Sequence, residues 1–160
     1  MLNLKYFTEI EAEEIKAIEE IVIATGFFSE EEVAVATSLV KERLEKKDAS
    51  GYFFILVKDG DRLVGFTCFG PIPCTQNRYD LYWIVVHPDY QGRGIGKILL
   101  QKTEKAIKNL AGEHLYIETS NRLQYVSTRA FYERCGYKKV AIIPDFYARG
   151  DDKVIYFKKL

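Results

Sequence analysis

The chain has 160 residues, a length typical of one domain with its own hydrophobic core. Hydrophobic residues make up 48% of the chain and aromatic residues 14%, which excludes the composition of a disordered segment. The 23 basic and 23 acidic residues give a formal net charge of zero, which argues against a general electrostatic grip on nucleic acid.

The cysteines and histidines favour reduced thiols and no metal centre. Cys68, Cys74 and Cys135 are an odd number without Cys-x-x-Cys spacing, and the two histidines lie far apart. Such thiols are typical of the cytoplasm. The N-terminal residues turn acidic at once, and no apolar run approaches about 18 residues, so we expect neither a secretory signal nor a membrane span.

Two helices are predicted first. Apolar residues recur at helical spacing between Thr8, a candidate cap, and Gly26, a candidate stop. The second helix covers residues 29–47, where Ser29 and Glu32 form a capping-box pattern.

Strands and further helices follow in alternation. Residues 51–70 predict two strands joined at Asp59-Gly60, a strong hairpin signal. The next elements are a central strand at 78–87, a helix at 95–109, a strand at 113–120, a short helix at 126–137 stopped by Gly136, and strands at 137–144 and 152–160 with a loop between them. This order predicts one α/β (α+β) domain over residues 1–160, with a single mixed sheet flanked by helices.

The stretch "VVHPDYQGRGIGKILL", Val85 to Leu100, places three glycines between a strand and a helix. A helix N-terminus offers unpaired N–H groups and a partial positive charge, and glycines let the backbone approach a ligand closely. Together they predict an anion cradle suited to phosphate, with Arg93 as an added charge.

Two common nucleotide-binding motifs match these glycines poorly. The P-loop needs four residues between its glycine and Gly-Lys, whereas Gly92 and Gly96 enclose three. The dinucleotide fingerprint needs its third glycine one residue later and a loop tight against the strand. A purely structural turn is the alternative to a phosphate cradle.

Val86-His87-Pro88 followed by Gln91-Gly92-Arg93-Gly94-Ile95-Gly96 resembles the acetyl-CoA loop of the GNAT acetyltransferase superfamily. The later segment "STRAFYERCGYKKV" resembles a second motif of that family, and the order of elements from Gly51 onward fits. Within the family the chain is most similar to the protein N-terminal alanine acetyltransferases.

The resemblance implies a GNAT fold with acetyl-CoA as co-substrate and no metal. It implies that the amides of residues 91–97 hold the CoA pyrophosphate and that strand 84–86 pairs with the pantetheine arm, where it splays from strand 114–120. Tyr125 stands where the family often has a CoA-contacting Asn, so either Asn121 reaches in from a longer loop or the contact is lost. The implied donor-binding residues are Ile84, Val85, Val86, Gln91, Gly92, Arg93, Gly94, Ile95, Gly96, Lys97 and Asn121.

Two catalytic roles also follow from the resemblance. Tyr132 stands at the position of the tyrosine that protonates the CoA thiolate; otherwise it is a core aromatic residue. Glu118, in "IETSN", stands at the position of the base that deprotonates the amine; its alternatives are a solvated strand end, Asp80, Tyr82 or a water relay. Residues 144–152 resemble the loop that lines the acceptor site, with Phe146 and Tyr147 as contacts.

The resemblance therefore predicts a cytoplasmic N-acetyltransferase in which a primary amine attacks acetyl-CoA directly in a ternary complex. The acceptor stays open between a protein N-terminus, a lysine and a small-molecule amine, and the protein is expected as a monomer or homodimer without nucleic-acid or membrane partners. A non-catalytic CoA-binding sensor is the alternative. A nicotinamide-dependent oxidoreductase ranks third, because it predicts an N-terminal strand, glycine loop and helix.

Overall fold

The computed structural model describes residues 2–160. The helices and strands follow one another as β1 (Leu4–Phe7), α1 (Glu14–Ala24), α2 (Glu30–Lys46), β2 (Phe53–Asp59), β3 (Arg62–Pro71), β4 (Arg78–Val86), α3 (Ile95–Asn109), β5 (His114–Ser120), α4 (Val126–Arg134), β6 (Lys138–Ala148) and β7 (Asp151–Lys159). Short 3-10 helices cover Lys47–Ser50, Pro88–Tyr90 and Leu123–Tyr125.

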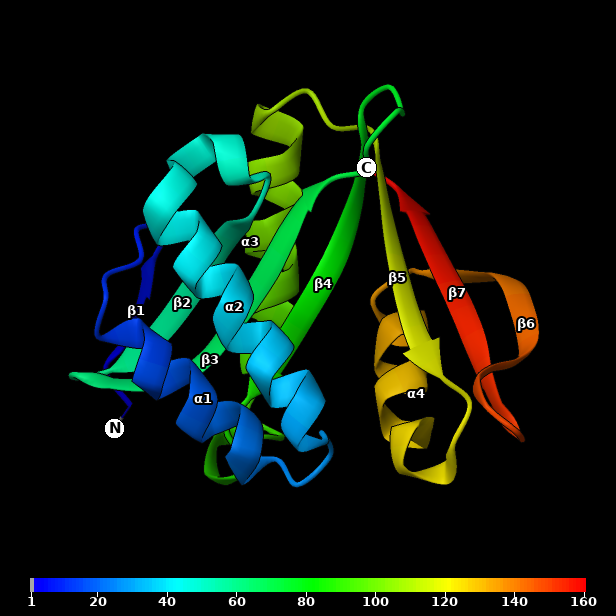
Figure 1. Cartoon of the computed structure of the whole chain (residues 1–160), viewed down its shortest axis with the longest axis horizontal. Coiled ribbons are helices and arrows are strands. Elements are labelled where there is room, and N and C mark those ends of the chain that lie inside the picture. Colours follow the sequence, from blue (N-terminus) through cyan, green and yellow to red (C-terminus); the bar gives the residue numbers. More distant parts are fainter. Residues whose placement is uncertain (1) are drawn as a thin grey trace. The chain divides into compact units, whose positions relative to one another are not determined.

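The strands form one mixed sheet in the order β1-β2-β3-β4-β5-β7-β6 (Figure 1). The β4–β5 pair is parallel, whereas β1–β2, β2–β3, β5–β7 and β6–β7 are antiparallel. The C-terminal hairpin thus inserts β7 between β5 and β6. This mixed sheet with its four helices confirms the predicted fold class.

Backbone contacts divide the chain into two compact units. The first contains the chain up to Gly70 and Trp83–Ala106, and the second contains Pro71–Tyr82 and Ile107–Leu160. Strand β4 and helix α3 each contribute residues to both units. None of the helices in residues 2–160 combines the length and apolar character needed to cross a membrane.

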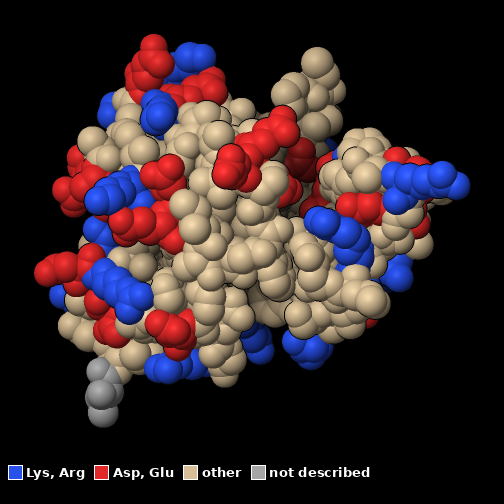
Figure 2. All heavy atoms as spheres, turned by 60° about the horizontal axis from the view of Figure 1, so that its bottom comes forward, with Lys and Arg blue, Asp and Glu red and all other residues tan. Residues whose placement is uncertain are grey.

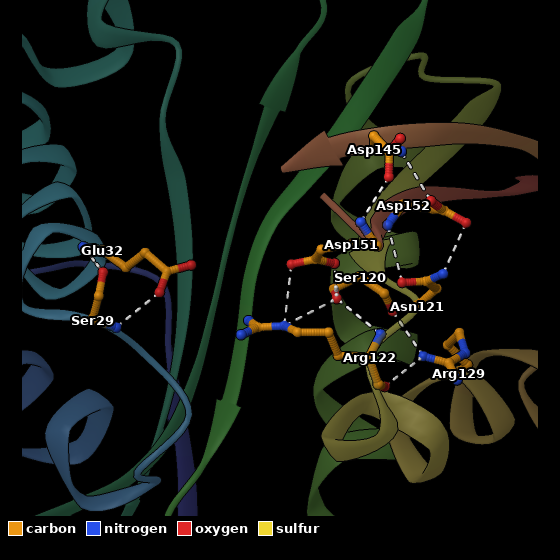
Figure 3. A network of polar contacts seen from close by, with 10 residues as sticks. Ser29, Glu32, Ser120, Asn121, Arg122, Arg129, Asp145, Asp151 and Asp152 are labelled. Carbon is orange, nitrogen blue, oxygen red and sulfur yellow. Dashed lines mark hydrogen bonds and ion pairs between the residues drawn. The ribbon is translucent and has the colours of Figure 1, made fainter. Parts of the chain in front are cut away.

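The first unit holds a core in which α1 and α2 contribute buried aliphatic residues. Ile18, Ile21, Val40, Leu56 and Phe66 are all essentially inaccessible to solvent. The capping box of α2 is confirmed, because Ser29 Oγ accepts from Glu32 N–H at 3.2 Å and Glu32 Oε2 accepts from Ser29 N–H at 2.8 Å (Figure 3).

The start of the chain differs from the prediction. Helix α1 begins at Glu14, so Thr8 is not its cap. Residues 4–7 instead form β1, which pairs with β2 in a register that joins Leu4 to Asp59. The buried Glu14 accepts from Glu11 N–H at 2.6 Å and pairs with Lys58 at 2.7 Å. The contact with Lys58 joins the start of the helix to distant β2, and helical spacing does not reveal it.

The segment predicted as a loop at 145–151 is largely strand, since β6 runs to Ala148 and β7 begins at Asp151. The register of the pair is irregular between Ile143 and Ala148. Asp145 N–H donates to Asp152 Oδ1 at 2.9 Å, and Gly150 N–H donates to Asp145 Oδ1 at 2.7 Å. These bonds hold an irregular hairpin where composition alone predicts a loop.

In the second unit, successive residues of β5 and β7 alternate between two faces of the sheet. Ile117 is paired with Tyr156, and both are buried on the face that α4 covers through Tyr132 (Figure 1). We call this the α4 face. Glu118 and its neighbours at even positions on β5 point to the opposite face. That face also carries Lys153, which is opposite Ser120 in the register.

Candidate active site

The glycine loop in the first unit has the backbone conformation that its sequence predicts. Gly92 and Gly94 have φ values of +73° and +79°, which residues with a side chain rarely adopt. The first backbone bond of α3 runs from Ile98 N–H to the Gly94 carbonyl at 3.2 Å. The N–H groups of Ile95, Gly96 and Lys97 therefore precede the helical ladder, at the positive end of the helix dipole.

Tyr90 anchors this loop. Its hydroxyl donates to Asp59 Oδ2 at 3.1 Å, and the guanidinium groups of Arg62 and Arg93 lie over its ring at 5.7 and 5.5 Å from the centroid. Arg93 is thereby held beside the glycines, so its charge adds to that of the helix N-terminus.

His87 and Gln91 take part in the internal bonding of the loop. His87 N–H donates to the Val64 carbonyl at 2.9 Å, and its Nδ1 accepts from Asp89 N–H at 3.2 Å. Gln91 N–H donates to the Pro88 carbonyl at 3.2 Å, and Gln91 Nε2 donates to the Val86 carbonyl at 3.1 Å. Within the predicted cradle of residues 91–97, the Gln91 N–H is therefore already engaged inside the loop.

The end of β4 lies tightly against β3 within the first unit. Val85 is buried, while Ile84 and Val86 are partly buried. A Cβ added at Gly65 would lie 3.0 Å from both the Val85 carbonyl oxygen and Val57 Cγ1. A glycine at this position of β3 lets the strand approach Val85.

Tyr132, in the second unit, is buried with 4% of its surface exposed. Its ring centroid lies 5.8 Å from that of Tyr156 and 6.3 Å from that of Tyr137. Burial raises the pKa of Tyr132 well above its usual range, so the hydroxyl is protonated at neutral pH. It is therefore available as a proton donor, as well as being part of the aromatic packing.

Glu118 lies on the opposite face, in an ion pair with Lys153. Lys153 Nζ is 2.6 Å from Glu118 Oε2, and the side chains are 11% and 47% exposed, respectively. The same ammonium group lies 3.6 Å from the ring centroid of Phe146 and 5.9 Å from that of Tyr147. The Lys153 ammonium group thus pairs with Glu118, the predicted base, and lies over the rings of Phe146 and Tyr147, the predicted acceptor contacts.

Asp80 belongs to the same electrostatic cluster. Burial, together with the negative charge of Glu118, raises the pKa of Asp80 to about 6, while the positive charge of Lys153 acts to lower it. The β4–β5 register covers Arg78–Leu81 and His114–Ile117. Among residues 2–160, Glu118 to Ser120 pair with β7 and have no register partner on β4.

Asn121 belongs to a polar network that joins the segment after β5 to the β6–β7 hairpin (Figure 3). Its Nδ2 donates to Asp152 Oδ2 at 2.8 Å, and its Oδ1 accepts from Asp152 N–H at 3.0 Å. Ser120 Oγ donates to Asp151 Oδ1 at 2.5 Å, and Arg122 pairs with Asp151 at 3.1 Å. Both ends of the Asn121 amide are therefore already engaged within the second unit.

Sequence reasoning missed Lys153, Asp151 and Asp152. The one signal in the sequence that could have found Lys153 is the alternation along β7, which places it on the same face as Ile155 and Phe157. Among residues 2–160 no group of three or more His, Cys, Asp or Glu side chains is arranged to hold a metal ion. On the face shown in Figure 2, acidic and basic side chains are interspersed, in keeping with the net charge of zero.

Residues 15–137 match the acetyltransferase (GNAT) family, and the chain belongs to this family. This confirms the resemblance seen in the glycine loop and in the α4 segment, and with it the predicted enzyme class.

Individual relatives agree with the family assignment. A solved GNAT-family structure from Desulfovibrio desulfuricans has a TM-score of 0.96 and 38% identity, over 98% of each chain. An N-alpha-acetyltransferase of Saccharolobus solfataricus is 29% identical over 97 residues, which cover 60% of this chain and 57% of that protein. The matched region is thus little more than half of that relative's length.

A structure at lower identity shares the fold alone. The PaiA N-acetyltransferase from Thermoplasma acidophilum, solved in complex with coenzyme A, has a TM-score of 0.78 and 20% identity, over 99% of this chain and 100% of that one.

Proposed function

We propose that this protein is an N-acetyltransferase that transfers the acetyl group of acetyl-CoA to a primary amine by direct attack in a ternary complex. The observation that carries the proposal is the pair of left-handed glycines, Gly92 and Gly94, at the N-terminus of α3 in a GNAT-family chain. Since β4 and α3 belong to both compact units, we treat the chain as one functional domain.

The glycine loop fits the phosphates of the donor. A Cβ built on Gly92 or Gly94 would meet nothing within 4 Å, so both backbone positions face open space. The N–H groups of residues 92–97 bind the pyrophosphate, Arg93 offsets its charge, and the backbone of Ile84 to Val86 orients the pantetheine arm. Acetyl-CoA supplies the acetyl group, activated as a thioester.

The second unit supplies the proton transfers. The Tyr132 hydroxyl, which its raised pKa keeps protonated at neutral pH, donates a proton to the departing sulfur. The acceptor ammonium loses its proton to the carboxylate pair Asp80 and Glu118. Asn121 has the role of fixing the hairpin, because Asp152 engages both ends of its amide.

Similarity to the S. solfataricus N-alpha-acetyltransferase favours a peptide N-terminus as the acceptor over a small amine. Phe146 and Tyr147 are 51% and 46% exposed, and they offer apolar surface to residues that follow the reacting amine. We place the protein in the cytoplasm, since its cysteines, one of them buried, are free thiols. We expect it to be a monomer or homodimer.

A thiol-release assay with acetyl-CoA and a panel of amines tests the proposal. The panel contains peptides beginning with Ala or Ser, the same peptides with a blocked N-terminus, free lysine and a polyamine. We expect thiol release with at least one unblocked amine and none with the blocked peptides. Binding of CoA without turnover of any amine would favour the sensor alternative, and absence of both would reject the donor assignment.

A further inference from the structure

Lys153 is held more rigidly than a surface lysine. Its ammonium group lies 2.6 Å from Glu118 Oε2 and 3.6 Å from the centroid of the Phe146 ring, and only 11% of the side chain is exposed. An exposed ion pair gains little because fixing two long side chains costs entropy. Here the aromatic ring and the low exposure fix the ammonium group over the carboxylate, so its charge has a defined position.

The strand registers place Asp80 on the same face. Asp80 is paired with Tyr116, Glu118 is two residues further along β5, and Lys153 is opposite Ser120 on β7. Residues two apart share a face, as do residues directly opposite in neighbouring strands. Asp80, Glu118 and Lys153 therefore project from three strands to one face and form a cluster of two carboxylates and one ammonium group.

Other titratable groups also lie on this face of the second unit, but Glu118 and Lys153 are the charged groups that shift the pKa of Asp80. The remaining titratable groups on the surrounding strands are Arg78 and Tyr82 of β4, His114 and Tyr116 of β5, Lys138 and Tyr147 of β6, and Asp151 and Lys159 of β7. Arg78 is paired with Glu113 at 2.8 Å, and Asp151 is paired with Arg122 at 3.1 Å. The adjacent β3 carries only Arg62 and Cys68.

We propose that Lys153 is a positioning residue of the transfer reaction, which occupies Glu118 in an ion pair and leaves Asp80 as the carboxylate that takes the proton from the acceptor ammonium. This inference rests on the proposed function. It differs from the assignment of the base by resemblance, which selects Glu118. Proton binding by Glu118 would break its contact with Lys153, whereas Asp80 forms no ion pair within residues 2–160 that a proton would break.

The protonation behaviour of Asp80 supports this division of roles. A general base works best when its pKa lies near the working pH. Burial raises the pKa of Asp80 to about 6, so the group is ionised at neutral pH but binds a proton more readily than an exposed aspartate. Glu118 and Lys153 act on it in opposite directions, and the ion pair therefore sets how easily Asp80 accepts a proton.

The reaction balances with these groups. An N–H bond of the acceptor ammonium breaks and an O–H bond forms on Asp80. The neutral nitrogen then bonds to the thioester carbon, and the C–S bond breaks with its electron pair on sulfur. Tyr132 gives its proton to sulfur and is reprotonated by the second proton leaving the nitrogen, while Asp80 releases its proton to water.

The proposal predicts that the apparent pKa of Asp80 shifts in opposite directions in two variants, and these shifts can be measured without turnover. The Asp80 carboxyl is followed by 13C NMR in wild type, Lys153→Met and Glu118→Gln. We expect the apparent pKa to rise by about half a unit or more in Lys153→Met and to fall by a similar amount in Glu118→Gln. Lys158→Met is the matched control, because Lys158 is on β7 but donates to the Cys135 carbonyl on the α4 face. It should leave the titration unchanged.

The acidic limb of kcat/KM against pH should move in the same opposed directions, and Asp80→Asn should lower kcat/KM by roughly 10² with acetyl-CoA affinity preserved. Shifts of Asp80 in one common direction, or none, would overturn the role of Lys153. Full activity in Asp80→Asn with a 10² loss in Glu118→Gln would return the base to Glu118.

If Lys153→Met does not fold, the direction of the Asp80 pKa shift in Glu118→Gln, relative to wild type, decides the test: a fall supports the proposal, and no change or a rise overturns it. If wild type acetylates no amine, the proposed function fails while the titration still tests the cluster.

Discussion

Tyr132 and Glu118 lie on opposite faces of the β5–β7 sheet segment. Tyr132 packs on the α4 face, 5.8 Å from the ring of Tyr156, whereas Glu118 points from the other face to Lys153 at 2.6 Å. The proposed acid and the acidic cluster are therefore separate groups of residues, each in its own environment. A substitution in one group should leave the other intact, so the two roles are separable by experiment.

Gly94→Val tests the donor cradle. A β-branched residue cannot adopt the φ of +79° found at Gly94 without strain, so the loop must change shape where backbone meets phosphate. We expect acetyl-CoA affinity to fall at least tenfold, about 1.4 kcal/mol, by calorimetry.

Gly51→Val is the control for Gly94→Val, since Gly51 has a φ of +73° and open space around it, and it precedes β2 at the end opposite to Asp59, which bonds Tyr90 of the loop. It carries the same backbone strain and should keep its affinity for acetyl-CoA. Unchanged affinity in a folded Gly94→Val protein would contradict the cradle.

Tyr132→Phe tests the proton donor. The ring and its packing stay, and only the hydroxyl is lost, so stability should change by no more than about 1 kcal/mol. We expect kcat to fall by roughly 10², with acetyl-CoA affinity within a few-fold of wild type. Tyr137→Phe, at the neighbouring buried ring, should keep its kcat. Normal turnover in Tyr132→Phe would leave Tyr132 with a packing role alone.

Asp80→Asn should change the dependence of stability on pH. The folded-state pKa of Asp80, about 6, is above the usual value of 3.8, so between these values the folded protein binds more protons than the unfolded chain. The contribution of Asp80 to the free energy of unfolding therefore falls as pH rises through this window. We expect Asp80→Asn to melt above wild type at pH 7.5, with the difference vanishing towards pH 3.5. A larger advantage at the acidic end would refute the raised pKa.

Asn121→Ala distinguishes a structural role from a CoA contact. The substitution removes both hydrogen bonds to Asp152 and loosens the link to the β6–β7 hairpin. We expect a loss of about 1–3 kcal/mol in unfolding free energy, and a higher KM for the acceptor with acetyl-CoA affinity unchanged. A tenfold loss of acetyl-CoA affinity without a change in stability would show that Asn121 contacts the donor.

Local patterns predicted much of the structure. The capping box of Ser29 and Glu32 lies within one helical turn, and the glycines at 92 and 94 need only their own backbone conformation. Contacts between distant segments were not predictable in this way. The Glu14–Lys58 pair at the start of α1 depends on β2 lying beside this helix, and the Glu118–Lys153 pair depends on β7 lying beside β5. Nothing in the spacing of residues shows that β7 rather than β6 occupies that place.

The most direct test of the central claim is the mass of the amine product after incubation with acetyl-CoA labelled with 13C in its acetyl group. Wild-type protein should transfer the labelled acetyl group to the N-terminal nitrogen of an unblocked peptide, with one free CoA thiol released for each peptide acetylated. Gly94→Val should form far less product under the same conditions. CoA binding by the folded wild-type protein, with no labelled product from any unblocked amine tested, would contradict the account.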